Sequence, residues 1–367
     1  MIKLKRLLLL LFSVICVLTL NAYADEAGGF TVPDFRNENI EEITGYDDFA
    51  GLVENIIKGE MPVNTDVISR ILAFVAGDIK LCLTYIVSVM GFAVLSSCIK
   101  GSQLKLASGS GEIAYLVCYF MVAGFLLGIL QSTVKTAIGA SSTLGDFIKM
   151  SLPAYIGIVT SCGFNFSGSQ SIFLAMINVI SSFAGDFMIN AFFYMGILSV
   201  VSNMSEEIHL GKLIGILKQT MFWILGFLLT VFASLTALSG LNASGSAGTG
   251  IRALKYTVGK SVPLVGGFLA DSAELITASA LVFKNAFGTG GIIVIFCICL
   301  VPVLKLFVTG TLLKVASGLA EPFCDARMCD SIYQVGQTVI HIMVAVILMS
   351  VMFVLAFAVL LICGGTL

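Results

Sequence analysis

The chain has 367 residues, of which 58% are hydrophobic and only 11% are charged, and its mean hydropathy is +1.03. Soluble domains carry about 25% charged residues, so this composition excludes a water-soluble protein of this size. The net charge of −2 excludes a basic nucleic-acid-binding protein. The lipid bilayer is therefore the expected solvent for most of the chain.

Residues 1–24 have the pattern of a secretory signal peptide. Basic residues precede an unbroken apolar run from Leu7 to Leu20, and Ala22-Tyr23-Ala24 is the small-x-small pattern that signal peptidase cleaves. The alternative is a short anchor that stays uncut. Both interpretations place Asp25 and the residues after it outside the cytoplasm.

Residues 25–78 form an acidic extracytoplasmic segment with 12 acids and 3 bases. Its pattern predicts a short helix over 48–58, capped by Asp47 and ended by Gly59. A second, amphipathic helix is expected over 65–76, with its apolar residues at i, i+3 and i+4 spacing. This second helix could lie in the membrane interface, pack against a partner or pack on the protein's own membrane domain.

Residues 79–367 are expected to form an all-α, polytopic transmembrane helix bundle of about six to eight spans. A spanning helix needs about 20 mostly apolar residues. Two weaker segments contain helix-breaking residues, Pro153 in 147–164 and Pro263, Gly266 and Gly267 in 262–282, so we expect broken or re-entrant helices there. The six clear spans are 79–99, 113–133, 175–200, 217–239, 291–313 and 338–363.

The distribution of basic residues predicts which loops are cytoplasmic. Lys100 and Lys105 mark the first loop as cytoplasmic, and a loop at 240–261 carries three basic residues and no acid. Both loops lie on one side only if 147–164 crosses the membrane, which gives eight crossings with both mature ends outside. If both weak segments are hairpins instead, the loop 240–261 moves outside and the charge rule is broken.

Two segments, 113–200 and 217–313, share an order of strong span, broken span and strong span. Ser151-Leu152-Pro153 and Ser261-Val262-Pro263 mark corresponding positions in the two units. With eight crossings, the units would enter the membrane from opposite sides. An inverted repeat of this kind is typical of transporters, which bind substrates at broken helices.

Several polar residues lie within predicted spans, where they are candidates for lining a path. Asn178, Ser182, Asp186 and Asn190 recur every four residues and form one slowly winding stripe on a helix. A carboxylate near the middle of a span must face protein or water. One hypothesis pairs Asp186 with Lys305 or places both on a shared aqueous path. The alternative is a protonated Asp186 packed between helices and a Lys305 that extends toward the interface.

The sequence offers no catalytic, cofactor-binding or metal-binding motif. Gly259-Lys260-Ser261 resembles the end of a phosphate loop but lacks the first glycine and the preceding strand. His209 and His341 lack ligand spacing with any cysteine pair. Cys324 and Cys329 share a loop assigned to the cytoplasm, where a disulfide is not expected. We therefore expect neither enzymatic activity nor a cofactor.

The last third of the chain carries its most distinctive motifs. In this order and spacing they resemble the stage III sporulation protein AE family of endospore-forming bacteria, and the resemblance extends over nearly the whole chain. The motifs include Lys255-Tyr256 after Arg252, Val262-Pro263 with Gly266-Gly267, Lys284-Asn285-Ala286-Phe287-Gly288, Pro302 with Lys305, and Ala320-Glu321-Pro322-Phe323.

The resemblance implies a multi-pass protein of the mother-cell membrane around the forespore, with its mature N-terminus extracytoplasmic. It also implies membership of a channel-like, secretion-like complex that links mother cell and forespore. The expected partners are other stage III sporulation membrane proteins, and ATPase activity would come only through a partner. The protein would act as a conduit subunit or as an assembly platform. The alternative is a free-standing secondary transporter of a small solute.

Overall fold

The structure is a computed structural model that describes residues 35, 48–59, 83–84, 86–91, 94–95, 110–161, 170–204, 210–261 and 266–362. Within these ranges, the side chains of 110–115, 161, 170–174, 186, 238–261, 266–278 and 362 are outside the description. The described residues form helices joined by turns and contain no strand, which confirms the predicted all-α fold. The signal peptide and the second leader helix at 65–76 lie outside the described residues.

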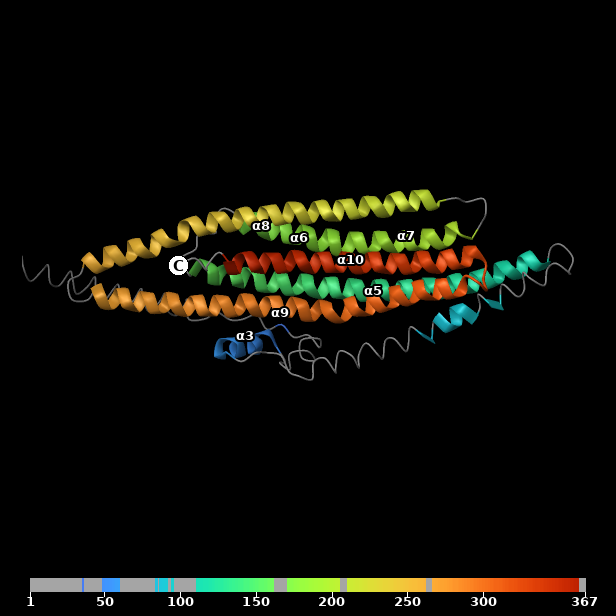
Figure 1. Ribbon diagram of the computed structural model, residues 1–367. Coiled ribbons are helices and arrows are strands. Elements are labelled where there is room, and N and C mark those ends of the chain that lie inside the picture. The colour runs from blue at the N-terminus through green and yellow to red at the C-terminus, as the bar shows by residue number, and fades with distance from the viewer. Residues whose placement is uncertain are drawn as a thin grey trace, which may run out of the picture.

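Long helices lie side by side along one axis and form an elongated bundle (Figure 1). In this bundle α10 is central and packs against α5, α7, α8 and α9. The segment formed by α6, η2 and α7 is helical throughout, and its middle element η2 is a π-helix. The bounds are α5 Ser110–Ser161, α6 Gln170–Ile180, η2 Ser181–Met188, α7 Ile189–Ser202, α8 Gly211–Ser261, α9 Gly266–Ala320 and α10 Ala326–Ile362.

Five helices within the described residues are long and apolar enough to cross a membrane. Three of them are much longer than a bilayer requires, with 52 residues in α5, 51 in α8 and 55 in α9. At a rise of about 1.5 Å per residue, helices of this length extend roughly 80 Å, whereas a bilayer with its headgroups is about 40–45 Å thick. The far ends of α8 and α9 accordingly extend beyond the end of α10 (Figure 1).

The structure differs from the sequence-based prediction where we expected broken helices and loops. Segment 147–164 is mostly the end of α5, which is helical on both sides of Pro153. The expected loop 240–261 is helical and belongs to α8. Helix α9 begins at Gly266 and continues into the next predicted span, while Pro263 lies outside the described residues. Pro153 lies within the apolar span Leu116–Thr160, where continuing the helix satisfies nearly every backbone N–H and C=O internally, and this outweighs the weak helix propensity of proline.

These continuous helices change the expected topology. The start of α5 and the end of α8 lie at opposite ends of the bundle (Figure 1), because three helical passages separate them. Helices α5 and α8 also start at the same end, so the units 113–200 and 217–313 run in the same direction instead of inverted. The total number of crossings stays a prediction, because most of 79–99 is outside the described part of the chain.

The leader helix α3, Phe49–Lys58, packs against the side of α9. Its cap is Asp48 rather than the predicted Asp47, since the Asp48 side chain accepts the Gly51 N–H at 2.9 Å. Gly59 ends the helix as predicted, with a left-handed φ of 80°. A carboxylate at the N-cap satisfies an N–H group that the first turn leaves without a partner. The face of α3 with Phe49, Leu52 and Val53 is buried.

An aromatic cluster joins α3 to the bundle. It consists of Phe49 from α3, Phe147 and Tyr155 from α5, Phe287 from α9 and Phe357 from α10, all with 0% exposure. Ring centroids lie 5.3 Å apart between Tyr155 and Phe287, 5.3 Å between Tyr155 and Phe357, and 5.0 Å between Phe49 and Phe287. Such rings contribute both buried area and favourable ring geometry. The interior of the bundle at this level is therefore filled by side chains.

Candidate functional site

The predicted polar stripe lies on α6, η2 and α7, and much of it faces outward. Asn178 and Ser182 are exposed and Asn190 is half-buried. Tyr194, one turn further, is 66% exposed. Asn178, Ser182 and Tyr194 lie within an apolar span, so the bundle presents polar side chains on its outer surface, where lipid cannot hydrogen-bond to them. The exposed part of the stripe therefore faces outward from a single copy, not toward its interior.

The π-helix η2 interrupts this span at its middle, and it is held tightly against α5. A Cβ added to Gly185 would overlap Ser141 Oγ and lie 3.4 Å from Ser141 Cβ, so a larger residue here would require the Ser141 hydroxyl to turn away. Ser141 Oγ in turn donates to Met349 Sδ of α10 at 3.2 Å. π-helical turns widen the helix and shift the faces of the residues that follow, and they occur frequently at functional sites.

The predicted pair of Asp186 and Lys305 comes from two different layers of the bundle. Asp186 belongs to η2, which packs on α5 and α10, whereas Lys305 is half-buried on α9. The side chain of Asp186 is outside the description, so its pairing with Lys305 stays a prediction.

Lys284 and Gly288, from the motif at 284–288, lie where α9 meets α5 and α10. Lys284 is fully buried, and its Nζ donates to the backbone oxygen of Leu361 at 3.0 Å. This places a cation at the C-terminal end of α10, where backbone carbonyls are left without helical partners and the helix dipole is negative. A Cβ on Gly288 would overlap Tyr155 Oη, so the glycine makes room for the aromatic cluster. Asn285 is exposed.

Glu321 and Pro322 form the turn between α9 and α10, and both side chains are exposed. The Glu321 N–H donates to Ser317 O at 3.1 Å, and the Cys324 N–H donates to Ala320 O at 2.9 Å. These bonds close the end of α9 before α10 begins. Four other predicted site residues have no described side chain: Gly266 and Gly267 start α9, and Lys255 and Tyr256 lie in the far part of α8.

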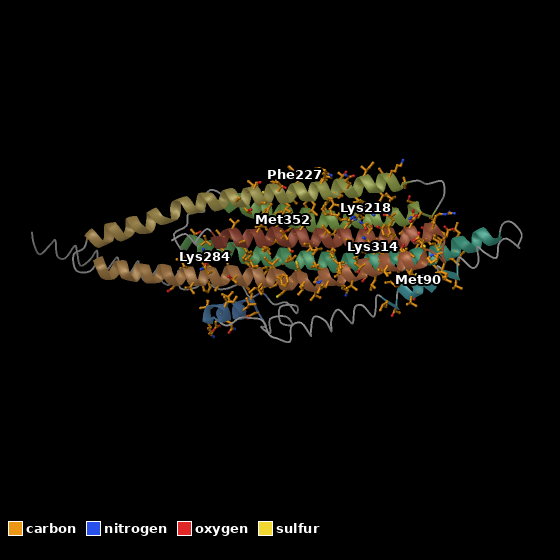
Figure 2. All side chains as sticks on the ribbon, in the orientation of Figure 1. Met90, Lys218, Phe227, Lys284, Lys314 and Met352 are labelled. Atoms are coloured by element: carbon orange, nitrogen blue, oxygen red, sulfur yellow. The ribbon has the colours of Figure 1, made fainter. Side chains whose placement is uncertain are left out.

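A second polar cluster escaped the sequence analysis. We call it the lysine–histidine cluster: Lys218 of α8, Lys314 of α9, and Gln334, Gln337 and His341 of α10. Lys218 is only 7% exposed and donates to Gln334 Oε1 at 3.1 Å. Gln337 Nε2 lies 3.2 Å from His341 Nε2. Figure 2 shows Lys218 and Lys314 toward the end where α10 starts, far from Lys284 at the other end.

This cluster has a sequence signal that could have revealed it. Gln334, Gln337 and His341 follow i, i+3 and i+7 spacing and therefore share one face of α10. Lys218, one turn before Phe222 and Trp223, lies within an apolar span. An ionisable residue inside a span indicates a functional site by default. The sequence pattern was tested at His341 only for metal-ligand spacing. Among the residues described, no group of three or more metal-ligating side chains lies together.

Comparison with known proteins identifies the family. The family model described as Stage III sporulation protein AE matches residues 48–364. Stage III sporulation protein AE of Bacillus subtilis (strain 168) is 24% identical over 256 residues, which cover 69% of this chain and 64% of that protein. The match thus spans less than two thirds of the length of this curated relative. No solved structure matches the chain. The chain belongs to the stage III sporulation protein AE family.

Proposed function

We propose that this multi-pass membrane protein is a subunit of a sporulation complex that links mother cell and forespore, and that it forms a conduit together with neighbouring subunits. The family and the apolar helices support a sporulation-associated membrane protein. The observation that carries the finer proposal is the exposed part of the polar stripe, Asn178 and Ser182, on the outer face of an apolar span. Its partners would be other stage III sporulation membrane proteins.

The packing of the bundle favours a path between subunits over a path through one copy. The aromatic cluster occupies the interior between α3, α5, α9 and α10. Asn178 and Ser182 face away from that interior. Burying an amide or hydroxyl in lipid without a hydrogen bond costs about 1–3 kcal/mol by protein mutational data, so a neighbouring subunit or a water-filled path should cover these two side chains.

The proposed location is the mother-cell membrane around the forespore, with the mature N-terminus and the C-terminus both extracytoplasmic. Two contacts support placing both termini on the same side. Helix α3 packs against Phe287 of α9, and Phe287 belongs to the same aromatic cluster as Phe357 near the end of α10. The leader helix thus lies beside the first half of α9, at the end of the bundle where α10 finishes.

Thiol labelling tests the conduit. Cysteines placed at Asn178, Ser182 and Asn190 are treated with a membrane-impermeant maleimide in membranes from sporulating cells, against the parent chain with its native cysteines. Val179→Cys and Phe187→Cys are matched controls, because both are exposed apolar positions on the same segment, at 54% and 51%. We expect the polar positions to react at least tenfold faster than the controls. Equal, slow labelling at all five positions would exclude an aqueous path along the stripe.

Affinity purification in mild detergent tests the complex. Copurification of other stage III sporulation membrane proteins is expected, whereas a free-standing secondary transporter would be recovered without them. The variant Ile57→Arg tests whether the leader helix binds these partners. Ile57 is 42% exposed on α3 and lies outside its buried face, so the substitution changes the surface of the helix without changing its packing on the bundle. Loss of partners with normal membrane insertion would indicate an assembly platform. Purification without any such partner from sporulating cells would refute the proposal.

A further inference from the structure

We propose that the junction of α7, α8 and α10 binds a phosphate-type oxyanion at Lys218 and His341. The binding site is distinct from the polar stripe and from the aromatic cluster. Its donors come from α8 and α10, and α7 contributes an aromatic ring that packs on His341.

Lys218 is a buried cation with a neutral partner. Its ammonium group carries three N–H donors, and its one hydrogen bond in the described part of the chain goes to Gln334 Oε1 at 3.1 Å. No carboxylate forms an ion pair with it among the described side chains. A buried charge without a counter-charge is costly, because an amide dipole replaces only part of its hydration. An anion bound beside Lys218 would supply the missing counter-charge.

His341 adds a second donor that has no acceptor within the described residues. The Gln337 amide nitrogen can only donate, so at 3.2 Å it makes His341 Nε2 the acceptor. The neutral ring then carries its proton on Nδ1, which is buried and makes no hydrogen bond to any described residue. The ring is held by Phe222 of α8 and Phe192 of α7, with centroids 4.7 and 5.7 Å away.

The two donors lie along the same helix contact. On α8, Phe222 lies one turn after Lys218. On α10, His341 lies two turns after Gln334, and the Phe222 ring packs on the His341 ring. These offsets are about 6 Å along α8 and about 10 Å along α10, at 1.5 Å per residue. A phosphate group can accept one bond on each of two oxygens, with N···O distances of about 2.8 Å, and this reach is shorter than the offset along α10. The flexible Lys218 side chain therefore has to extend along α8 toward His341 for one anion to contact both donors.

The surrounding charge favours an anion. Lys218 and Lys314 both act electrostatically on His341. Lys314 lies over the Tyr333 ring, with its Nζ 5.7 Å from the ring centroid. The described acid closest in sequence to Gln334 on α10 is Asp330, one turn earlier, and its side chain is exposed. Two cations thus act on one half-buried ring, and no acid forms an ion pair with either of them among the described side chains.

The phosphate group could reach this site from solution or as part of a lipid headgroup. Gln334, Gln337 and His341 are each half-buried, and α8 is the least buried of the five long apolar helices, so the junction lies near the outer surface of the bundle. Lys218 lies seven residues from the start of α8, a depth of about 10 Å. Both sources share the same recognition chemistry, and the experiment separates them.

The full chain, purified in a neutral detergent, is tested by thermal denaturation in three conditions. These are inorganic phosphate, sodium chloride at the same ionic strength, and micelles doped with phosphatidylglycerol. We expect phosphate or phosphatidylglycerol to raise the denaturation midpoint by several degrees over chloride. A response to phosphate identifies a free anion, and a response only to phosphatidylglycerol identifies a lipid headgroup. No rise with either one overturns the proposal.

Two variants and a matched control assign the response to the junction. Lys218→Met should fold, because it replaces an unpaired buried cation by an apolar side chain of similar length. It should abolish the rise and raise the midpoint in chloride alone. His341→Phe should weaken the apparent phosphate or lipid affinity at least tenfold. Lys212→Met, an exposed lysine on the same helix, should respond like the parent chain. An equal response of Lys218→Met and Lys212→Met would refute the site.

Discussion

Gly291 of α9 gives a sharp test of how the aromatic cluster holds the bundle together. A Cβ at this position would overlap Phe357 Cε1 and lie 2.5 Å from Cδ1 and 2.9 Å from Cζ. The Phe357 ring has 0% exposure and is stacked on Tyr155 and Phe147, with centroids 5.3 and 6.1 Å away. The ring therefore has no free direction in which to move, and Gly291→Ala should force it out of its place.

The cost can be worked out by comparison with a glycine that has open space. Gly128 of α5 is exposed and has nothing within 4 Å of an added Cβ. Both Gly→Ala changes gain about 1 kcal/mol of helix propensity, and this gain cancels in the comparison. Overpacking a filled core costs about 1–3 kcal/mol. Gly291→Ala should thus be about 2 kcal/mol less stable than Gly128→Ala.

The assay is thermal denaturation of the purified chain in detergent. With an unfolding entropy of about 2.1 cal/mol/K per residue, a chain of 367 residues shifts by about 1.3 °C per kcal/mol, so we expect Gly291→Ala to denature about 2–3 °C below Gly128→Ala. Phe357→Leu in the Gly291→Ala background should recover part of the loss, since contacting residues couple by about 0.5–3 kcal/mol. Identical midpoints for the two alanine variants, or no recovery by Phe357→Leu, would refute the packing argument.

Two further predictions concern the end of the bundle where α10 starts. Tyr119 Oη donates to Val200 O at 2.8 Å and contacts Ser331 Oγ at 2.8 Å. Tyr119→Phe should lower the free energy of unfolding by about 1–3 kcal/mol, because it leaves a buried carbonyl without this donor. Tyr194→Phe, on the exposed surface, should not change the denaturation midpoint. Partial burial raises the pKa of the Cys324 thiol above its usual value of 9.0, against a smaller opposite effect of its hydrogen bond with Cys329. Because the thiolate is the reactive form, maleimide labelling of Cys324 should be slow at pH 8 and should keep increasing above pH 9, with Cys324→Ser identifying the signal. A labelling rate that levels off at or below pH 9 would contradict this.

Composition alone determined the class of protein. With 11% charged residues, the chain could not cover a soluble surface, and long apolar stretches in lipid have to be helical because only a helix satisfies its own backbone. The motifs around Lys284-Asn285 and Glu321-Pro322 also indicated the family by their residues and spacing. The stop signal at Gly59 was read correctly, because a left-handed residue after a helix depends on local geometry alone.

Helix continuity could not be read from local sequence signals. Pro153 and the Gly-rich segment 240–261 are poor helix formers, and in water they would favour a break. In the structure, α5 and α8 continue through them. At Pro153, which lies within an apolar span, a break would expose polar backbone groups to lipid, where nothing else satisfies them. The same continuity makes segments 113–200 and 217–313 run in the same direction instead of inverted, and the repeat itself stays a prediction.

Which polar residues lie together was decided only by the packing of the helices. The stripe of Asn178, Ser182 and Asn190 was recognised from its spacing, but spacing does not tell whether a helix face points into the bundle or out of it. Lys218 and Gln334 are 116 residues apart, and only the contact between α8 and α10 brings them to 3.1 Å. Sequence periodicity determines which residues share a face of one helix, whereas the facing of two helices depends on how their side chains and glycines fit, and that is a property of the folded bundle.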